Sequence, residues 1–278
     1  MDFQFFLSLI CGIFIGGIAG YLGTLMLSKK MALVAGPLGH LTLPGIALAL
    51  LYGFDVSLGA FPFVVLGVVL IWLFEMKTKL PMEALTAVVF ASGVAIAFLF
   101  LPIEQAETAL VGDITKVSLS EAVITAILCF LVFFIIKKIY PQMVLINISE
   151  DLAKIEKINV KKYNFFYLGA IAIIVALGVK MVGGLLTAAL IAIPVCAARN
   201  LSKNLFQYVF LATSFGATSA FLGIMLFKFT GFPAGPLIII ISASIFLISY
   251  TLSYSLDRFG TSKKPPLWRF SRFALCLR

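Results

Sequence analysis

The sequence predicts an all-α fold, a polytopic bundle of transmembrane helices. Of its 278 residues, 62% are hydrophobic and only 12% are charged, which is about half the charged share of an ordinary soluble domain. Mean hydropathy is +1.13, and the apolar residues form long continuous runs without the alternation of strands. Because backbone groups in lipid must find hydrogen-bond partners within their own segment, runs of about 20 residues predict membrane-spanning helices.

Charged residues divide the chain into nine apolar segments, each of which we expect to cross the membrane once. The segments are 3–27, 31–51, 58–74, 85–102, 119–136, 164–180, 183–198, 205–227 and 234–256. The sixth and seventh are joined only by the short sequence KMVGG, so they can also form one bent unit, which would give eight crossings. At the start of the fifth segment, Glu121 follows Ser118 and is interpreted as an N-terminal cap.

The distribution of basic residues predicts the orientation of the bundle. If the N-terminus lies outside, 18 of the 21 Lys and Arg residues fall in the cytoplasmic connections and tail, at 28–30, 75–84, 137–163, 199–204 and from 257. Only Lys116, Lys180 and Lys228 then remain outside. Because basic connections face the cytoplasm, we expect the N-terminus outside and the C-terminus inside. Residues 1–256 are expected to form one transmembrane domain and residues 257–278 a basic cytoplasmic tail, with no nucleic-acid partner.

The longest cytoplasmic connection contains the signals of a short amphipathic helix at about residues 149–159. Ser149 is a favourable N-cap, and two acids follow it in the first turn, where they suit the helix dipole. Asn159 can end the helix. Three apolar residues recur at a spacing of three and form one stripe: Leu152, Ile155 and Ile158.

Two interpretations of this helix remain open. It is either a surface element that rests on lipid headgroups or a docking element for a soluble partner. Pro141 and a short β-branched stretch precede it, so we expect the fifth span to end near residue 136 and the connection to begin there.

His40 is the only histidine of the chain, and no charged residue lies within nine positions on either side of it. Pro37 and Pro44 flank it. Because proline interrupts helical hydrogen bonding, we expect irregular backbone here, with carbonyl groups that face protein or a cavity. An imidazole in an apolar segment needs a partner, and from the residues alone a lone buried histidine is more often structural than a ligand.

Five segments, taken in order, resemble a known family. They read KKMALVAGPLGHLTLPGIALALLYG, MEALTAVVFASGVAIAFLFL, VGDITKVSLSE, a long block from SEDLAKIEKINV to CAARNLSKN, and FPAGPLIIIISASIFLIS. No single motif is decisive, but their order and spacing are similar to those of the permease subunit of zinc/manganese/iron-type ATP-binding cassette importers. The resemblance extends from about residue 10 to residue 255.

The resemblance implies a function and a set of partners. The chain would be a homodimeric permease in a prokaryotic-type plasma membrane, forming the pathway for zinc, manganese or iron. An extracytoplasmic metal-binding protein would deliver the ion, and no resident cofactor is expected. ATP would be hydrolysed by a separate subunit, since the chain contains no Gly-x-x-x-x-Gly-Lys-Ser/Thr. The ATPase would dock on the helix of the long cytoplasmic connection, through Asp151, Leu152, Ala153, Ile155 and Glu156.

The chain departs from the family pattern around the histidine. The family has an Asp four residues before this His, where both side chains face one cation, but this chain has Gly36. Gly39 replaces the family's Ser, and Thr230 stands near a position that is usually acidic. His40 is therefore expected to be a transient metal ligand, aided by the backbone at Gly36, Pro37, Pro44 and Gly45.

Two alternatives to this site remain: a substrate other than a bare ion, such as a metal chelate, and a purely structural His40. For the whole chain, the rival is an ATP-independent membrane carrier or scaffold. A secondary carrier should show titratable residues in the middle of its spans, and this sequence shows only His40.

Overall fold

The computed structural model describes residues 3–29, 35–53, 56–78, 80, 82–100, 117–184 and 186–258. Within these ranges every regular element is a helix, which confirms the all-α prediction. The helices are α1 (Phe3–Ser28), α2 (Ala35–His40), α3 (Leu43–Tyr52), α4 (Val56–Thr78), α5 (Met82–Phe100), α7 (Leu119–Ile148), α8 (Glu150–Ile155), α9 (Val160–Val182), α10 (Thr187–Leu201), α11 (Leu205–Thr230) and α12 (Ala234–Arg258). Most of the predicted basic tail, residues 259–278, lies outside the described part.

Six helices of the described part are long and apolar enough to span a membrane. They lie in α1, α4, α7, α9, α11 and α12. The predicted count of nine is not confirmed, because the second, fourth and seventh predicted segments are not among these six. The second segment is divided between α2 and α3, the fourth corresponds to α5, and the seventh corresponds to the shorter helix α10.

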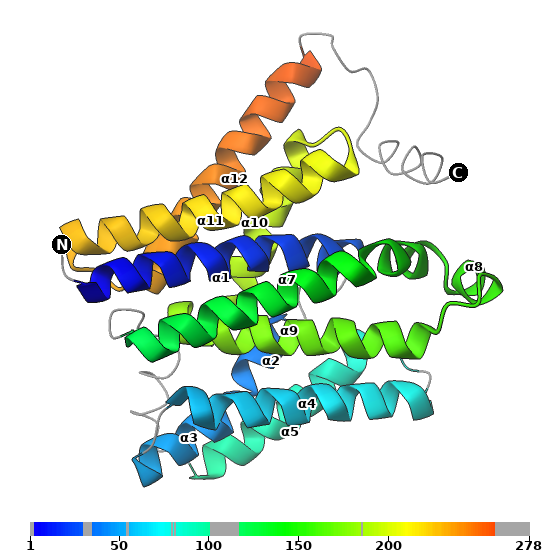
Figure 1. Ribbon diagram of the computed structural model, residues 1–278, viewed down its shortest axis with the longest axis horizontal. Helices are drawn as coiled ribbons and strands as arrows, with labels where there is room; N and C mark the ends of the chain where they lie inside the picture. The colour runs from blue at the N-terminus through cyan, green and yellow to red at the C-terminus, as the bar shows by residue number, and fades with distance from the viewer. Residues whose placement is uncertain are drawn as a thin grey trace.

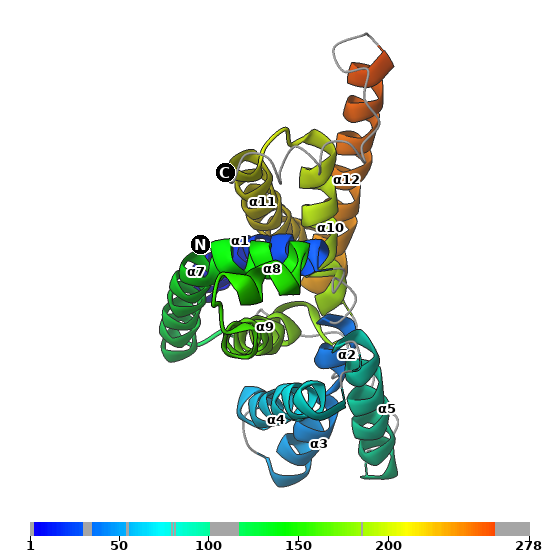
Figure 2. The ribbon, with the colours of Figure 1, turned by 90° about the vertical axis from the view of Figure 1, so that its right-hand side faces the viewer.

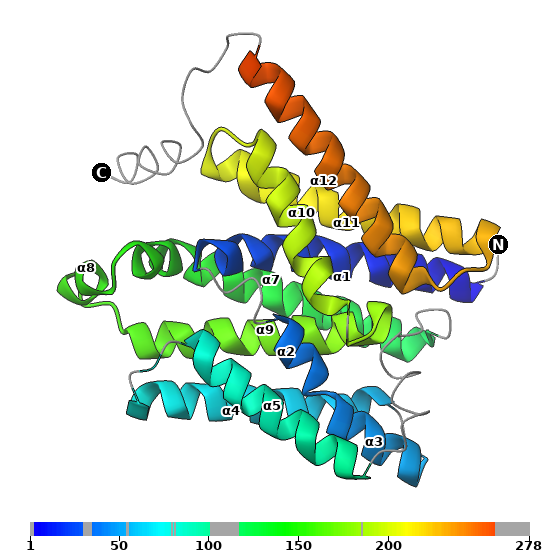
Figure 3. The same ribbon diagram turned by 180° about the vertical axis from the view of Figure 1, so that it is seen from behind.

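The long helices form one layer, and shorter or oblique helices form a second. In Figure 1, α4, α9, α7, α1 and α11 run along the same axis. Figure 2 shows α12, α10, α2 and α5 aligned behind them, and Figure 3 views this second layer from its own side. The most apolar stretch of α1 is 61% buried, against 22% for α7 and α12, so α1 lies inside the bundle and the other two lie at its surface.

Glycines allow α1 to approach α11 closely. A Cβ atom added at Gly16 or Gly20 would collide with the backbone of α11 at Gly216 or Ala212. Such backbone contact between small residues is how helices associate in a membrane, where lipid removes the hydrophobic drive between them.

Helix α7 corrects the predicted end of the fifth span. It starts as predicted, with a capping box in which Ser118 and Glu121 bond each other's backbone N–H groups. It then continues through Pro141 to Ile148, twelve residues beyond the predicted end at 136. Pro141 is exposed and removes only one helical hydrogen bond, while Met143 and Ile146 beyond it are buried in the core. Packing of this last stretch therefore outweighs the proline.

Helix α8 is shorter than the predicted 149–159. Ser149 caps it as predicted, accepting a hydrogen bond from the Leu152 N–H at 3.3 Å. The helix ends at Ile155 because the backbone of Lys157 turns to a positive φ of 56°. Asn159, which was expected to end α8, instead caps α9 by accepting a bond from the Lys162 N–H.

Candidate functional site

The helix around His40 is interrupted, as the two prolines predict. Helix α2 ends at His40, and α3 begins after the two-residue turn of Leu41 and Thr42. The buried Thr42 hydroxyl donates to the Gly39 carbonyl at 2.6 Å and so satisfies a group that the turn leaves free. Pro44 lies in the first turn of α3, where its missing N–H costs nothing.

This turn rests against a second interruption, between α9 and α10. A Cβ atom added at Gly39 would lie 2.7 Å from the Gly184 carbonyl oxygen, and one added at Gly184 would lie 3.1 Å from the Gly39 oxygen. Gly183 has a φ of 87°, a conformation that favours glycine. Two stretches of irregular backbone thus meet inside the bundle, the one place where a membrane protein tolerates them.

The His40 side chain is half-buried and lies against α5. Its ring is tilted at 42° to that of Phe90, with the centroids 5.5 Å apart. Within the described part, no hydrogen bond joins the imidazole to another residue. Within the same residues no group of three or more His, Cys, Asp or Glu could hold a metal ion. The imidazole nitrogens can therefore bind a transient ligand, though as a single donor.

The other predicted pathway residues divide between the two short helices. Gly36 and Pro37 belong to α2, and Gly45 belongs to α3. A Cβ atom at Gly45 would collide with the Gly59 carbonyl of α4, so this glycine is a contact between helices. Gly45 thus fixes α3, and with it the turn after His40, to α4.

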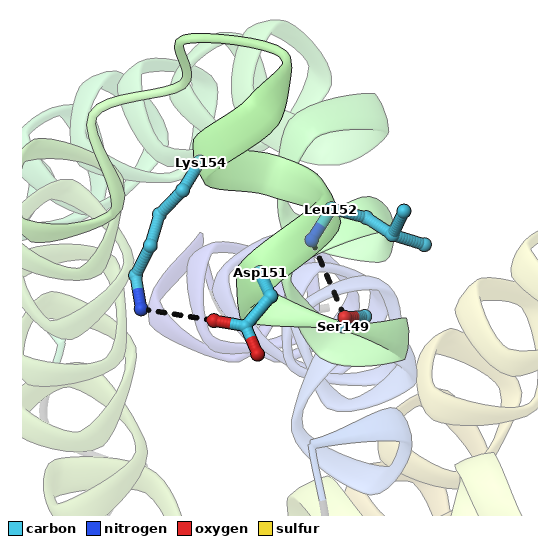
Figure 4. A network of polar contacts seen from close by, with 4 residues as sticks. All are labelled: Ser149, Asp151, Leu152 and Lys154. Atoms are coloured by element: carbon cyan, nitrogen blue, oxygen red, sulfur yellow. Dashed lines mark hydrogen bonds and ion pairs between the residues drawn. The ribbon is translucent and has the colours of Figure 1, made fainter.

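The predicted coupling residues present a mixed surface on α8. Leu152 and Ile155 are 49% and 74% exposed, whereas Ala153 is fully buried and anchors the helix. The Lys154 ammonium pairs with Asp151 at 3.2 Å (Figure 4). Both charged side chains are largely exposed, so this pair contributes little to stability. Figure 4 shows the Leu152 side chain directed away from the pair.

A groove adjoins these exposed apolar side chains. Its volume is about 710 Å³, and it lies between α8, the end of α7 and the start of α9. Leu145 and Ile158 contribute apolar walls, and Lys157, Lys162 and Glu156 contribute charge. An exposed apolar helix beside a groove is a surface to which a soluble protein can bind.

The structure also contains a partly buried polar network that no sequence pattern predicted. The Lys29 ammonium donates to Asn164 Oδ1 at 2.9 Å, and Asn164 Nδ2 donates to Glu75 Oε1 at 3.0 Å. The ammonium also lies 5.6 Å from the centre of the Tyr167 ring. Lys29 and Glu75 were expected in the cytoplasmic connections 28–30 and 75–84, whereas Glu75 lies in the last turn of α4. Asn164 is 135 residues from Lys29 and 89 from Glu75, so no local pattern predicts their contact.

Electrostatics links this network to α8. Burial lowers the pKa of the Lys29 ammonium, and the negative charges of Glu75 and Glu150 oppose that shift. Glu150 is the first residue of α8. The charge of Lys29 is therefore supported in part by a residue of the exposed helix.

Comparison with known proteins identifies the family. The profile described as "ABC 3 transport family" matches residues 2–253. The chain belongs to this family. The resemblance drawn from the five motifs is thereby confirmed, and the chain is a transport subunit and a multi-pass membrane protein.

Individual relatives cover most of the chain. The manganese transport system membrane protein MntC of Listeria monocytogenes is 22% identical over 87% of this chain and 88% of its own length. The high-affinity zinc uptake system membrane protein ZnuB of Buchnera aphidicola is 25% identical over 88% and 96%. The solved structure "PsaBC from Streptococcus pneumoniae in complex with Fab" has a TM-score of 0.77 and 25% identity, covering 90% of this chain and 92% of that one.

Proposed function

We propose that this chain is the permease subunit of an ATP-driven importer of a divalent transition metal: zinc, manganese or iron. The family match over residues 2–253 carries the proposal. The relatives named above are transport proteins for manganese and zinc, and the chain shares its fold with PsaBC.

We propose nine crossings, with the N-terminus outside, the C-terminus inside and α8 in the cytoplasm of a prokaryotic-type cell. Contacts between Phe14 and Phe130, and between Thr24 and Tyr140, indicate that α1 and α7 run in the same direction. Figure 1 shows α9 and α11 returning from the end of the bundle where α8 lies. Described lysines gather at this end: Lys29, Lys77, Lys154, Lys157, Lys161, Lys162 and Lys203. This supports a cytoplasmic assignment.

The proposed partners follow from this orientation. An ATP-binding subunit would dock on the exposed Leu152 and Ile155 and the groove beside them, because those apolar surfaces lie outside the expected bilayer. A metal-binding protein would dock at the opposite end. A second copy of the chain would complete the pathway, which we place beside His40 and the interrupted backbone at Gly39 and Gly184.

The experiment that tests this function is a substrate panel on the assembled complex. The chain and its ATP-binding subunit are reconstituted in vesicles and supplied with Mn²⁺, Zn²⁺, Fe²⁺ or the same metals as chelates. We expect ATP-dependent uptake of at least one free ion. Uptake of chelates alone would show that the substrate is a metal chelate and not the bare ion. Uptake that needs no ATP would favour an ATP-independent carrier.

A further inference from the structure

We propose that Lys29, Asn164 and Glu75 form a polar latch that couples the position of α8 to that of α4 during transport. The inference rests on the proposed function for the meaning of the coupling, and on the geometry for the latch itself. It assigns a positioning role to three residues outside both the docking surface and the surroundings of His40.

The latch is a continuous bridge across three helices. Lys29 directly follows α1, Asn164 lies near the start of α9, and Glu75 lies in the last turn of α4. Asn164 is 3% exposed. Its side-chain amide accepts a hydrogen bond from Lys29 and donates one to Glu75. Asn164, which accepts the hydrogen bond from Lys29, is therefore also the residue that donates a hydrogen bond to Glu75.

The need to hold the helices together does not explain why this network is charged. Taking charged groups out of water is expensive, and apolar residues of similar volume often hold such sites equally well or better. The neighbouring contacts already join these helices: Trp72 of α4 packs edge-on against Phe165 of α9 and donates its indole N–H to the Lys161 carbonyl. A charged bridge beside such packing suits a contact that must open and close.

Helix α8 is tied to the latch by the chain itself, because only residues 156–159 separate it from α9, which carries Asn164. Glu150 adds an electrostatic effect. Its carboxylate attracts the Lys29 ammonium and repels the Glu75 carboxylate. Because Glu150 is the exposed first residue of α8, a partner that displaces α8 changes both interactions at once. The support of the Lys29 charge falls, which weakens the bond from Lys29 to Asn164, while the repulsion of Glu75 is relieved, which strengthens the bond from Asn164 to α4.

Helix α4 continues the path towards His40. Its Gly59 lies against Gly45 of α3, and its Gly67 faces the Leu41 side chain in the turn that follows His40. A displacement of α4 must therefore move this turn, or open a gap against it. The latch thus connects the surface that meets the partner to the interrupted helix.

The first test measures the latch without any partner. In the full-length chain in lipid nanodiscs, Glu150→Gln should slow amide hydrogen exchange in the last turns of α4 by roughly twofold to fivefold, because it removes one solvent-exposed charge that repels Glu75. Asn147→Ala is the matched control. It removes the bond from Asn147 to Ser28 at the same end of the bundle and should leave α4 unchanged. Unchanged α4 exchange in Glu150→Gln would overturn the latch.

The second test separates coupling from stability. In the triple variant Lys29→Met, Glu75→Leu, Asn164→Leu, apolar groups replace the whole network, so no charge is left buried alone. We expect a near-normal melting temperature, retained ATPase binding and hydrolysis, and at least a fivefold loss of Mn²⁺ taken up per ATP. Normal uptake per ATP would overturn the proposal, and so would a failure to fold, which would show a structural network. Absence of ATP-driven uptake in the wild type would instead refute the proposed function, leaving hydrogen exchange to judge the latch.

Discussion

At the scale of single residues, the site depends on how His40 is held. Its backbone is fixed by the turn of Leu41 and Thr42 and by the contact of Gly39 with Gly184, while its ring touches Phe90. The interruption itself was predictable, because Pro37 and Pro44 flank the histidine. The contact with Gly184 was not, since nothing near residue 40 indicates which distant backbone fills the space beside a glycine.

Replacement of His40 tests its proposed role as a ligand. His40→Ala should lower metal uptake strongly while thermal stability and ATPase binding stay near wild type, because the imidazole makes no hydrogen bond to another residue of the described part. A structural imidazole would instead cost about 1–3 kcal/mol of unfolding free energy. Lower stability with uptake per folded complex preserved would contradict the pathway role.

A second substitution places an acid four residues before the histidine. Gly36→Asp puts a carboxylate and the imidazole at helix positions that face the same side, so metal binding should tighten when His40 is present and not in His40→Ala. Binding is measured by isothermal titration with Mn²⁺ and Zn²⁺. If neither substitution changed the binding of Mn²⁺ or Zn²⁺, a substrate other than a bare ion would be favoured.

The contact between the two interrupted helices can be tested with glycine replacements. Gly39→Ala brings a Cβ atom to 2.7 Å from the Gly184 oxygen, and such overpacking costs about 1–3 kcal/mol. Gly169→Ala in α9 meets nothing within 4 Å and should be neutral or gain up to about 1 kcal/mol from helix propensity. Equal melting temperatures for the two variants would show that the Gly39 backbone is not closely packed.

At the scale of elements, the sequence predicted helix starts better than helix ends. Ser118 with Glu121 and Ser149 act as caps where expected, because capping is a local interaction between a side chain and nearby N–H groups. The ends of α7 and α8 depend on packing of distant residues and on one positive φ, which no local pattern indicates. The contacts of Lys29 and Glu75 with Asn164 were not predicted for the same reason.

Helix α8 provides the test at this scale. The double variant Leu152→Asp, Ile155→Asp should leave membrane insertion intact, since both side chains are exposed, and should abolish binding and stimulation of the ATP-binding subunit. Leu80→Asp is a suitable control, because Leu80 is 52% exposed between α4 and α5 and lies outside the proposed docking surface. If the double variant still captured the partner, the interpretation of α8 as a helix that rests on lipid headgroups would be favoured instead.

At the scale of the whole molecule, the distribution of charge and the course of the long helices agree. Composition alone predicted an all-α membrane bundle, because no other backbone arrangement satisfies such continuous apolar runs. The number of crossings was harder to predict. Helices α2, α3 and α10 are short and do not individually reach the length of a membrane span.

Reporter fusions test the orientation. A reporter placed after residue 278 should be active on the cytoplasmic side, and a tag before Met1 should be accessible from outside, as 18 of the 21 basic residues indicate. Proteolytic access in sealed vesicles provides an independent measurement. Localisation of both ends to the same side would require an even number of crossings and would contradict nine.

The central claim is that this chain moves a metal ion only when a partner hydrolyses ATP. It is tested most directly by Mn²⁺ and Zn²⁺ flux in sealed vesicles that contain the chain and its ATP-binding subunit, with and without ATP on the side of α8. We expect transport that requires both the ATP-binding subunit and ATP and that disappears in the variant Leu152→Asp, Ile155→Asp. Equal metal flux without ATP, or undiminished ATP-driven flux in that variant, would contradict it.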